Sequence, residues 1–347
     1  MIAVVIPCYR ETAAVLSVIA AVPPPVDRIY CVDDGCPDGT GDLVERECAD
    51  PRVTVLRHAR NRGVGGAMAT GYLQALADGA EIIVKIDGDG QMAPRLIPAF
   101  VEPIRAGRAD YVKGNRFFRP ETVAAMPTVR LVGNAVLSFL NKFSSGYWQI
   151  FDPTNGFTAI HARVLWLMPL ERIDRSYLFE TEMLYRLGTL RAVVLDLPVK
   201  PVYGDERSHL VPHRMILPLL GRHGANFLRR IVYCYFLRDF SVASLEWLLG
   251  PALILFGLIF GASAWASAGA SGVEATAGTV MLAALPIILG VQALLSALNF
   301  DSANQPRTPI HPTLGDLLDE TEEGVGPRTA SPTNPETDHG AGGDGGE

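Results

Sequence analysis

Paired cysteines are missing from this sequence of 347 residues. The cysteines number five, which is odd, and they form no CxxC pair and no cluster with histidine: Cys8, Cys31, Cys36, Cys48 and Cys234. This pattern argues against a disulfide framework and against a zinc site built on such pairs. A secretory signal is also missing, since the opening MIAVVIPCY has only a short apolar run and no basic start. We therefore expect free thiols in a reducing compartment.

The net charge is close to zero outside the C-terminal tail. The whole chain has a formal charge of −7, but residues 301–347 hold ten acids against two arginines. The preceding 300 residues hold 28 basic and 27 acidic side chains, so the acidity belongs to the tail. The tail is rich in Pro, Gly and Thr, and we expect residues 302–347 to be disordered. Nucleic acid is not expected as a partner.

Short apolar runs alternate with segments of helical patterning over residues 1–115. Strands are predicted from IAVVIP, RIYCVDD, VTVLRH and EIIVKID, and helices from 11–21, 40–49 and 64–79. This alternation is typical of an α/β fold with a mostly parallel sheet covered on both faces. Ligands of such sheets bind beyond the carboxyl ends of the strands. Three of the predicted strands end in polar residues: Tyr9-Arg10-Glu11, Asp33-Asp34 and Asp87-Gly88-Asp89.

Two carboxylates follow the apolar run of EIIVKID at once. Asp87 and Asp89 are separated by Gly88, and Gln91 supplies a further oxygen nearby. An isolated DxD is more often a solvated acidic turn, but its place directly after an apolar strand favours a metal site. Hard oxygen ligands suit Mg²⁺ or Mn²⁺, ions that usually share their site with substrate phosphates. The predicted ligands are Asp87, Asp89 and Gln91.

A second strand ends in VDDG, residues 32–35. Here Asp33 or Asp34 could accept hydrogen bonds from a nucleobase or a ribose. The alternative is an acidic turn that caps the next helix, with Asp38 and Thr40 as cap candidates. Both interpretations stay open at this point.

Two further stretches fit a nucleotide site. In PCYRE, Pro7 and Tyr9 could shape a base pocket while Glu11 binds a polar edge, although the stretch could also be a plain helix start. NRGVGGAMATG is a glycine-rich turn into a helix that includes Asn61 and Gly63. It resembles a phosphate cradle but lacks the Lys-Ser/Thr of a P-loop and the GxGxxG spacing. The alternative to a phosphate cradle is a loop that packs beside a nucleotide without binding its phosphates.

The C-terminal third has the pattern of a membrane protein. Residues 207–240 hold six arginines and one acid among apolar residues, which is typical of basic amphipathic helices at a membrane surface. The apolar runs 245–266 and 279–300 are each long enough to cross about 30 Å of hydrocarbon. A buried pair of core helices is the alternative. Arginines flank the two runs and the loop between them has no Lys or Arg, which predicts both ends in the cytoplasm.

Taken as a set, PxYxE, DDGCPDGT, NxGxxxA and DxDxQ resemble glycosyltransferase family 2, whose fold is called GT-A. Cys36 stands where the family usually has serine. The later stretches GNRF, DPTNGFTAI and FETEMLYR resemble the branch that makes polyprenyl-phosphate sugars, which includes the dolichyl-phosphate mannose synthases. The resemblance implies a GT-A catalytic domain at 1–210, followed by basic juxtamembrane helices at 211–242, two transmembrane helices at 243–301 and the tail.

The resemblance also implies the reaction, an inverting transfer from a nucleotide-diphosphate sugar to a polyprenyl phosphate of the dolichyl or undecaprenyl type. The acceptor phosphate is already anionic, so the site needs cations to hold it rather than a strong base. Arg116 is the first choice because arginine contacts phosphate through two parallel hydrogen bonds. The other candidates for the acceptor phosphate are Arg130, Lys200, Arg207 and Ser208. The implied catalytic residues are Asp89, Arg116, Asp152 and Glu182.

The implied nucleotide-sugar contacts are Pro7, Tyr9, Glu11, Asp33, Asp34, Asn61, Gly63, Asp87, Gly88 and Asp89. Some roles stay open. Asp152 could orient the acceptor or the sugar, or serve only as a turn former before Pro153. Glu180 and Glu182 point different ways on a helix, and either could face the sugar. The donor is equally open, since GDP-mannose, UDP-glucose and UDP-GlcNAc all fit such a pocket.

Three other functions compete with this one. A processive polysaccharide synthase would carry a QxxRW motif, where this chain has NFLRRIVY. A transferase acting on another lipid acceptor would share the same motifs. An inactive sugar-nucleotide-binding scaffold is disfavoured by the intact Asp87 and Asp89. We expect an integral protein of the cell membrane with a cytoplasmic catalytic domain, and a homo-oligomer is left open.

Overall fold

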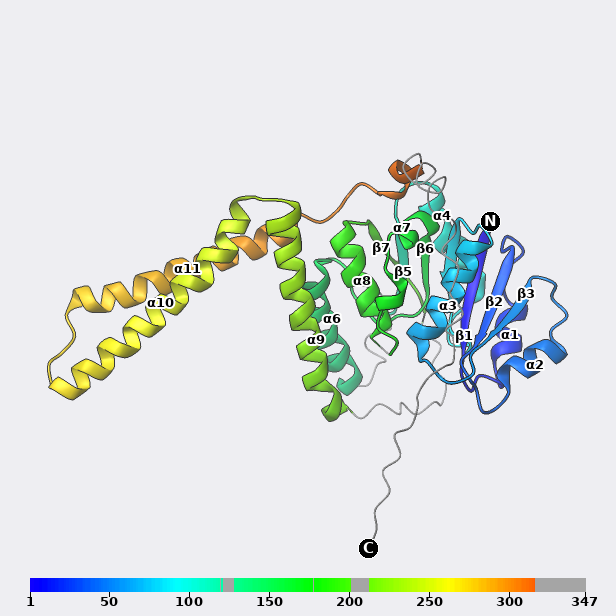
Figure 1. Ribbon diagram of the computed structural model, residues 1–347, viewed down its shortest axis with the longest axis horizontal. Coiled ribbons are helices and arrows are strands. Elements are labelled where there is room, and N and C mark those ends of the chain that lie inside the picture. Colours follow the sequence, from blue (N-terminus) through cyan, green and yellow to red (C-terminus); the bar gives the residue numbers. More distant parts are fainter. Residues whose placement is uncertain (119, 121–127, 177, 201–211, 316–347) are drawn as a thin grey trace, which may run out of the picture.

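A seven-stranded sheet lies at the centre of the fold (Figure 1). The computed structural model describes residues 1–118, 120, 128–176, 178–200 and 212–315. The strand order is β3-β2-β1-β4-β6-β5-β7, and among these strands β6 runs antiparallel to both neighbours while the other pairs are parallel. The strands are β1 (Ile2–Cys8), β2 (Arg28–Asp33), β3 (Val53–Arg57), β4 (Ile82–Lys85), β5 (Tyr111–Asn115), β6 (Thr158–His161) and β7 (Val194–Pro198).

The first third of the chain forms the alternation that its sequence predicts. All four predicted strands are present, and the predicted helices correspond to α1 (Val15–Ala20), α2 (Thr40–Glu47) and α3 (Val64–Ala77). Helix α1 begins four residues later than expected. Arg10 has a left-handed φ of 64°, and the Glu11 carbonyl accepts hydrogen bonds from the next turn, so PCYRE forms a tight turn before the helix.

Helices cover both faces of the sheet because side chains alternate along each buried strand. Val5 of β1 packs in a cluster with α3, while the adjacent Val4 packs in the opposite cluster with α1. The first face is completed by α7 (Ala162–Trp166) and α8 (Phe179–Leu190), and the second by α2 and α4 (Ile97–Arg105). The short 3₁₀ turns η1 (Pro94–Leu96) and η2 (Leu170–Arg172) lead into or follow these helices.

Beside α8 lies a further helical layer, formed by α6 (Thr128–Ser145), α9 (Pro212–Val232) and the π-helical turn η3 (Tyr233–Arg238) (Figure 1). The basic segment predicted at 207–240 is helical over residues 212–238. Two of its arginines have acidic partners within the protein, and contact of the segment with a membrane surface stays a prediction. Arg222 pairs with Asp174, and Arg230 is buried against Asp301.

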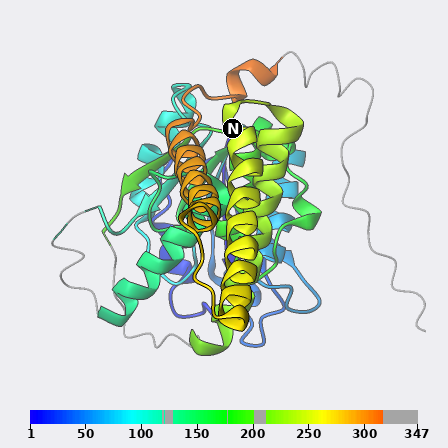
Figure 2. The ribbon, with the colours of Figure 1, turned by 90° about the vertical axis from the view of Figure 1, so that its left-hand side faces the viewer.

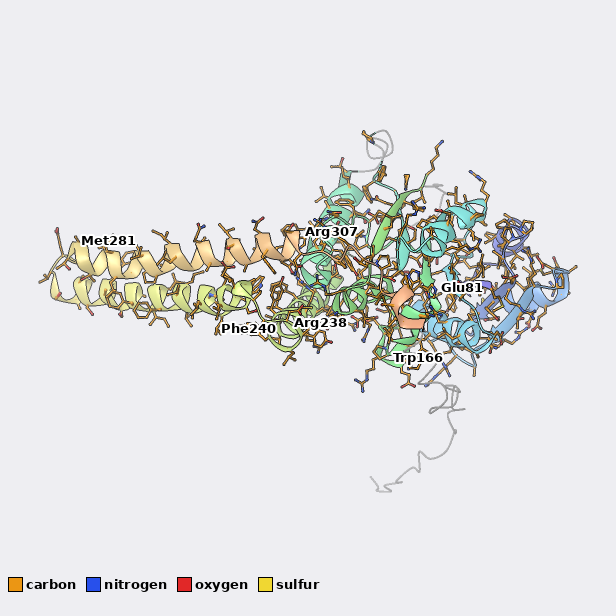
Figure 3. All side chains as sticks on the ribbon, turned by 90° about the horizontal axis from the view of Figure 1, so that it is seen from above. Glu81, Trp166, Arg238, Phe240, Met281 and Arg307 are labelled. Carbon is orange, nitrogen blue, oxygen red and sulfur yellow. The ribbon has the colours of Figure 1, made fainter. Side chains whose placement is uncertain are left out.

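Two long apolar helices, α10 (Val242–Ser271) and α11 (Ala277–Ala303), pack against each other as a hairpin that projects from the sheet domain (Figures 1 and 2). Both are long and apolar enough to cross a membrane, and most of their surface is exposed. Glycines allow the close approach, since a Cβ on Gly290 would lie 2.6 Å from the Gly250 carbonyl oxygen. In Figure 3, Met281 lies at the far end of the hairpin and Phe240 where it joins the domain.

The chain after the hairpin returns to the sheet domain, which corrects part of the disordered tail predicted from residue 302. Helix α11 continues to Ala303, and the 3₁₀ turn η4 (His311–Leu314) docks beside β5. The carboxylate of Asp110 accepts hydrogen bonds from the backbone N–H of Ile310 (3.0 Å) and His311 (2.9 Å) and from His311 Nδ1 (2.8 Å). These contacts order a proline-containing stretch whose composition alone predicts disorder. Residues 316–347 lie outside the described part of the chain.

Candidate active site

Several of the predicted functional residues gather at one edge of the sheet. The carboxyl ends of β1, β2 and β4 meet there, and so does the loop that precedes the antiparallel strand β6. A cavity of about 100 Å³ opens at this edge. Its lining includes residues of the DGDGQ, GNRF and DPTNGF motifs, and it carries both acidic and basic side chains. The lining residues include Asp87, Asp89, Gln91, Arg116, Asn155, Gly156, Phe157 and Lys200.

The DGDGQ turn is shaped by its glycines. A Cβ on Gly88 would lie 3.3 Å from the side chain of Glu11, so the PCYRE turn packs directly against the acidic turn. Gly90 has a φ of 77°, which glycine adopts without strain. The carboxylate of Asp89 accepts a hydrogen bond from the backbone N–H of Gln91 at 2.9 Å. The backbone of this turn thus places Asp87, Asp89 and Gln91 in the lining of the cavity.

Lys85 is a site residue that the sequence reasoning missed. Its side chain is 1% exposed, and its ammonium group lies 2.6 Å from Asp87 Oδ1 and 3.1 Å from Glu180 Oε1. Burial lowers the pKa of Lys85, but the two carboxylates outweigh burial and hold the pKa above its ordinary value. An ionisable residue within the apolar run EIIVKID, two positions before Asp87, was the available signal, because alternate strand residues share a face.

Arg116 and Asp152 form a two-point ion pair at the edge of the cavity. Arg116 Nε donates to Asp152 Oδ2 at 2.8 Å and Nη2 donates to Oδ1 at 2.6 Å. Asp152 is buried and has a left-handed φ of 54°. Burial raises the pKa of this carboxyl, but the hydrogen bonds and the charge of Arg116 lower it by more. The pKa of Asp152 therefore lies below its usual range. Asp152 therefore fixes the guanidinium group.

Of the two glutamates on α8, Glu180 contacts the site. It is buried and pairs with Lys85. Glu182, which the resemblance implied as catalytic, instead pairs with Arg186 one turn along its own helix (2.7 Å) and accepts a hydrogen bond from Asn226 of α9 (3.0 Å). The helix rotates residues two apart to different faces, which separates their environments.

Asp33 and Asp34 both have protein partners. Asp33 accepts hydrogen bonds from the backbone N–H of Cys36 and of Gly41, each at 2.8 Å, so it caps α2 in place of the candidates Asp38 and Thr40. Asp34 accepts from the backbone N–H of Arg62 and Gly63 at 2.8 Å and lies 2.6 Å from His58 Nδ1. The VDDG motif thus holds the turns that follow β2 and β3, and base or ribose contact stays a prediction.

The glycine-rich turn packs against protein backbone. A Cβ on Gly63 would lie 2.1 Å from the Arg175 carbonyl oxygen, and the N–H of Gly65 donates to the same oxygen at 3.1 Å. Asn61 Oδ1 accepts a hydrogen bond from the Gly63 N–H. These contacts explain the glycines without a phosphate. Tyr9 follows β1 and is 40% exposed, which keeps it a candidate for the nucleotide.

Comparisons with known proteins decide the family. A family profile described as "Glycosyl transferase family 2" matches residues 3–167. The UDP-N-acetylglucosamine–dolichyl-phosphate N-acetylglucosaminyltransferase of Methanococcus voltae is 30% identical over 219 residues, which are 59% of this chain and 87% of that protein. The chain belongs to glycosyl transferase family 2. The polyprenol monophosphomannose synthase of Mycolicibacterium smegmatis is 32% identical to this glycosyltransferase over 201 residues, 56% of this chain and 75% of that protein.

The fold of this glycosyltransferase is likewise shared with a solved structure. Mannosyl-3-phosphoglycerate synthase from Rubrobacter xylanophilus matches with a TM-score of 0.50 at 19% identity, covering 69% of this chain and 77% of that one. The predicted GT-A architecture is thereby confirmed. Arg207 and Ser208 lie outside the described residues, as does the side chain of Arg130 at the start of α6.

Gly156 offers a direct test of this geometry. A Cβ there would lie 2.3 Å from Asp87 Oδ2 and 2.4 Å from Lys85 Nζ, so Gly156→Ala must displace the Asp87 carboxylate. We expect kcat to fall about 10²-fold, since a misplacement of about 1 Å in a catalytic site can cost that much. Gly269→Ala in α10 is the matched control, because no atom lies within 4 Å of its Cβ. Wild-type kcat in Gly156→Ala would contradict the importance of this placement.

Proposed function

We propose that this glycosyltransferase moves a sugar, with inversion, from a nucleotide-diphosphate sugar to a polyprenyl phosphate at a membrane surface. The proposal rests on the lining of one cavity, which combines the carboxylates of Asp87 and Asp89 with the cations Arg116 and Lys200. Two phosphate-bearing substrates need such a mixed lining. The acceptor class is supported by the two relatives, whose names specify dolichyl phosphate and polyprenol.

A divalent cation fits the acidic side of the cavity. Asp87, Asp89 and Gln91 line it together and offer hard oxygen atoms, which suit Mg²⁺ or Mn²⁺. Within the described residues no three His, Cys, Asp or Glu side chains group as a complete metal site. One or two carboxylates completed by substrate phosphates is the usual arrangement for Mg²⁺. When bound, the cation would supply Lewis-acid stabilisation of the departing diphosphate.

The residues of the chain would then orient the acceptor. A phosphate oxygen of the lipid attacks the anomeric carbon, the bond from that carbon to the diphosphate breaks, and the electron pair leaves with the nucleoside diphosphate. No proton transfer is required, since the attacking oxygen is already anionic. Arg116 and Lys200 would hold the phosphate in line, and Asp152 acts as a positioning residue through its two hydrogen bonds with Arg116.

The nucleoside end of the donor is proposed to lie beside the carboxyl end of β1. Tyr9 is exposed there, and Glu11 lies next to Gly88 of the acidic turn. Asp33 and Asp34 would support this region mainly by holding the turns that contain Cys36 and Gly63. The carboxyl edge of a parallel sheet is where such ligands bind.

The helical hairpin is proposed to span the membrane, with both ends in the cytoplasm as the arginine pattern predicts. The acceptor remains in the bilayer, because each CH₂ group exposed to water costs about 0.8 kcal/mol. A set of exposed apolar side chains on α6 and α9, on η3 and just after it supports contact with the bilayer. Its members are Val132, Val136, Phe139, Leu228, Val232, Tyr233, Leu237 and Phe240.

The test is a panel of labelled nucleotide sugars. The purified full chain in detergent, supplied with Mn²⁺ and a polyprenyl phosphate, is incubated in turn with GDP-mannose, UDP-glucose and UDP-GlcNAc. We expect one donor to label an extractable lipid that mild acid cleaves. A labelled polymer would instead favour a polysaccharide synthase, and a labelled lipid resistant to mild acid would favour another lipid acceptor.

A further inference from the structure

Lys85 is a buried charge directly behind Asp87 and Gly156, two residues that line the cavity, and fold stability does not explain it. It ends β4, whose preceding residues Ile83 and Val84 are fully buried in the core. Replacing a buried ion pair by apolar residues of similar volume is often neutral or stabilising. The pair between Lys85 and Glu180 therefore calls for a role at the site it borders.

The ammonium group of Lys85 has an acceptor for each of its three N–H bonds. These are Asp87 Oδ1 at 2.6 Å, Glu180 Oε1 at 3.1 Å and the Gly156 carbonyl oxygen at 3.3 Å. A lysine ammonium has three donors and no acceptor. Lys85 thus has no donor left for a substrate, and it acts through the groups that it holds.

Two carboxylates share this one cation, and they differ in access. The side chain of Asp87 is 31% exposed and lines the cavity, whereas Glu180 is 11% exposed and lies behind Lys85. The positive charge of Lys85 opposes the binding of any second cation at Asp87. The negative charge of Glu180 offsets that opposition. The three groups together carry one net negative charge.

We propose that Glu180 is a positioning residue that acts through Lys85: it balances the ammonium charge so that Asp87 stays fixed yet able to hold the divalent cation of the donor. The inference rests on the proposed function, because it takes Asp87 as a metal ligand. In this arrangement Lys85 orients the carboxylate of Asp87, and Glu180 does not contact the sugar.

Binding of Mn²⁺ alone to the full chain in detergent tests the proposal, with free Mn²⁺ followed by electron paramagnetic resonance. In Glu180→Gln the full charge of Lys85 faces Asp87, and we expect the Mn²⁺ dissociation constant to rise about tenfold. Lys85→Met/Glu180→Gln removes both charges and is expected to return the constant to within about threefold of wild type. Lys85→Gln/Glu180→Gln is a second neutral pair if the first does not fold. Glu45→Gln, an exposed glutamate of α2, is the matched control.

Each other outcome overturns the inference in a recognisable way. An unchanged Mn²⁺ constant in Glu180→Gln together with a reduced kcat would mean that Glu180 acts on the substrates directly. Binding that stays weak in both neutral pairs would make Glu180 a ligand in its own right. If Asp89→Ala binds Mn²⁺ as tightly as wild type, the metal assignment of the proposed function fails, and the inference fails with it.

Discussion

Asp89→Ala is expected to lower kcat for sugar transfer by about 10³-fold while the protein stays folded. A metal-bound leaving group is stabilised by several kcal/mol, and about 4 kcal/mol corresponds to 10³ in rate. Asp89 lines the cavity, and its carboxylate accepts a hydrogen bond from the N–H of Gln91. Because Asp89 is half-buried in a turn and lies outside the hydrophobic core, we expect its replacement to affect chemistry more than stability. Initial rates with the donor identified by the labelled panel, at saturating Mn²⁺, measure the effect.

Asp42→Ala is the control for this change. Asp42 is an exposed residue of α2 that pairs with Arg57 at 2.7 Å, away from the cavity. Exposed pairs of this kind contribute about 0–1 kcal/mol, so kcat should be unchanged. Equal unfolding temperatures of the two variants would show that the loss in Asp89→Ala is catalytic. Full activity of Asp89→Ala would refute the metal assignment.

Arg230→Met is expected to lower the free energy of unfolding by about 3–5 kcal/mol, the usual cost of removing one partner from a buried ion pair. Arg230 and Asp301 form two hydrogen bonds, of 2.7 and 2.9 Å, between α9 and the end of α11. Tyr235 and Trp148 donate to the same carboxylate at 2.7 and 2.8 Å. Without Arg230, a buried charge would keep only two neutral donors at this joint between hairpin and domain.

Denaturant unfolding in detergent, followed by tryptophan fluorescence, measures this effect. Arg229→Met is the matched control, since Arg229 is the exposed neighbour on the same helix and a surface change of this kind usually stays within about 0.5 kcal/mol. Arg230→Met/Asp301→Asn should recover part of the loss by removing the unpaired charge. If Arg230→Met unfolds at the same denaturant concentration as wild type, the joint does not hold the hairpin to the domain.

Local patterns in the sequence predict the first half of the fold well. Four strands and three helices follow from apolar periodicity alone, and the acidic turn after β4 is visible because DGDGQ directly follows a buried run. The two long helices follow from uninterrupted apolar stretches. Each of these signals lies within about 20 consecutive residues, so no knowledge of tertiary contacts is needed to find it.

Contacts between distant segments were not predictable in the same way. Lys85 and Glu180 are 95 positions apart, and nothing near either residue indicates the other. Asp33 has a role that a motif does not reveal, because its carboxylate caps α2 from eight residues away. The composition of the segment after α11 predicts disorder, but the buried Asp110, 200 positions away, accepts hydrogen bonds from its N–H groups. Such roles depend on which surfaces the fold brings together.

A structure of the full chain with Mn²⁺ and its nucleotide sugar tests the central claim most directly. The account predicts that Asp87 and Asp89 ligate the ion and that the ion contacts the donor pyrophosphate, with Arg116 on the acceptor side of the same cavity. A pyrophosphate bound away from both carboxylates would contradict it.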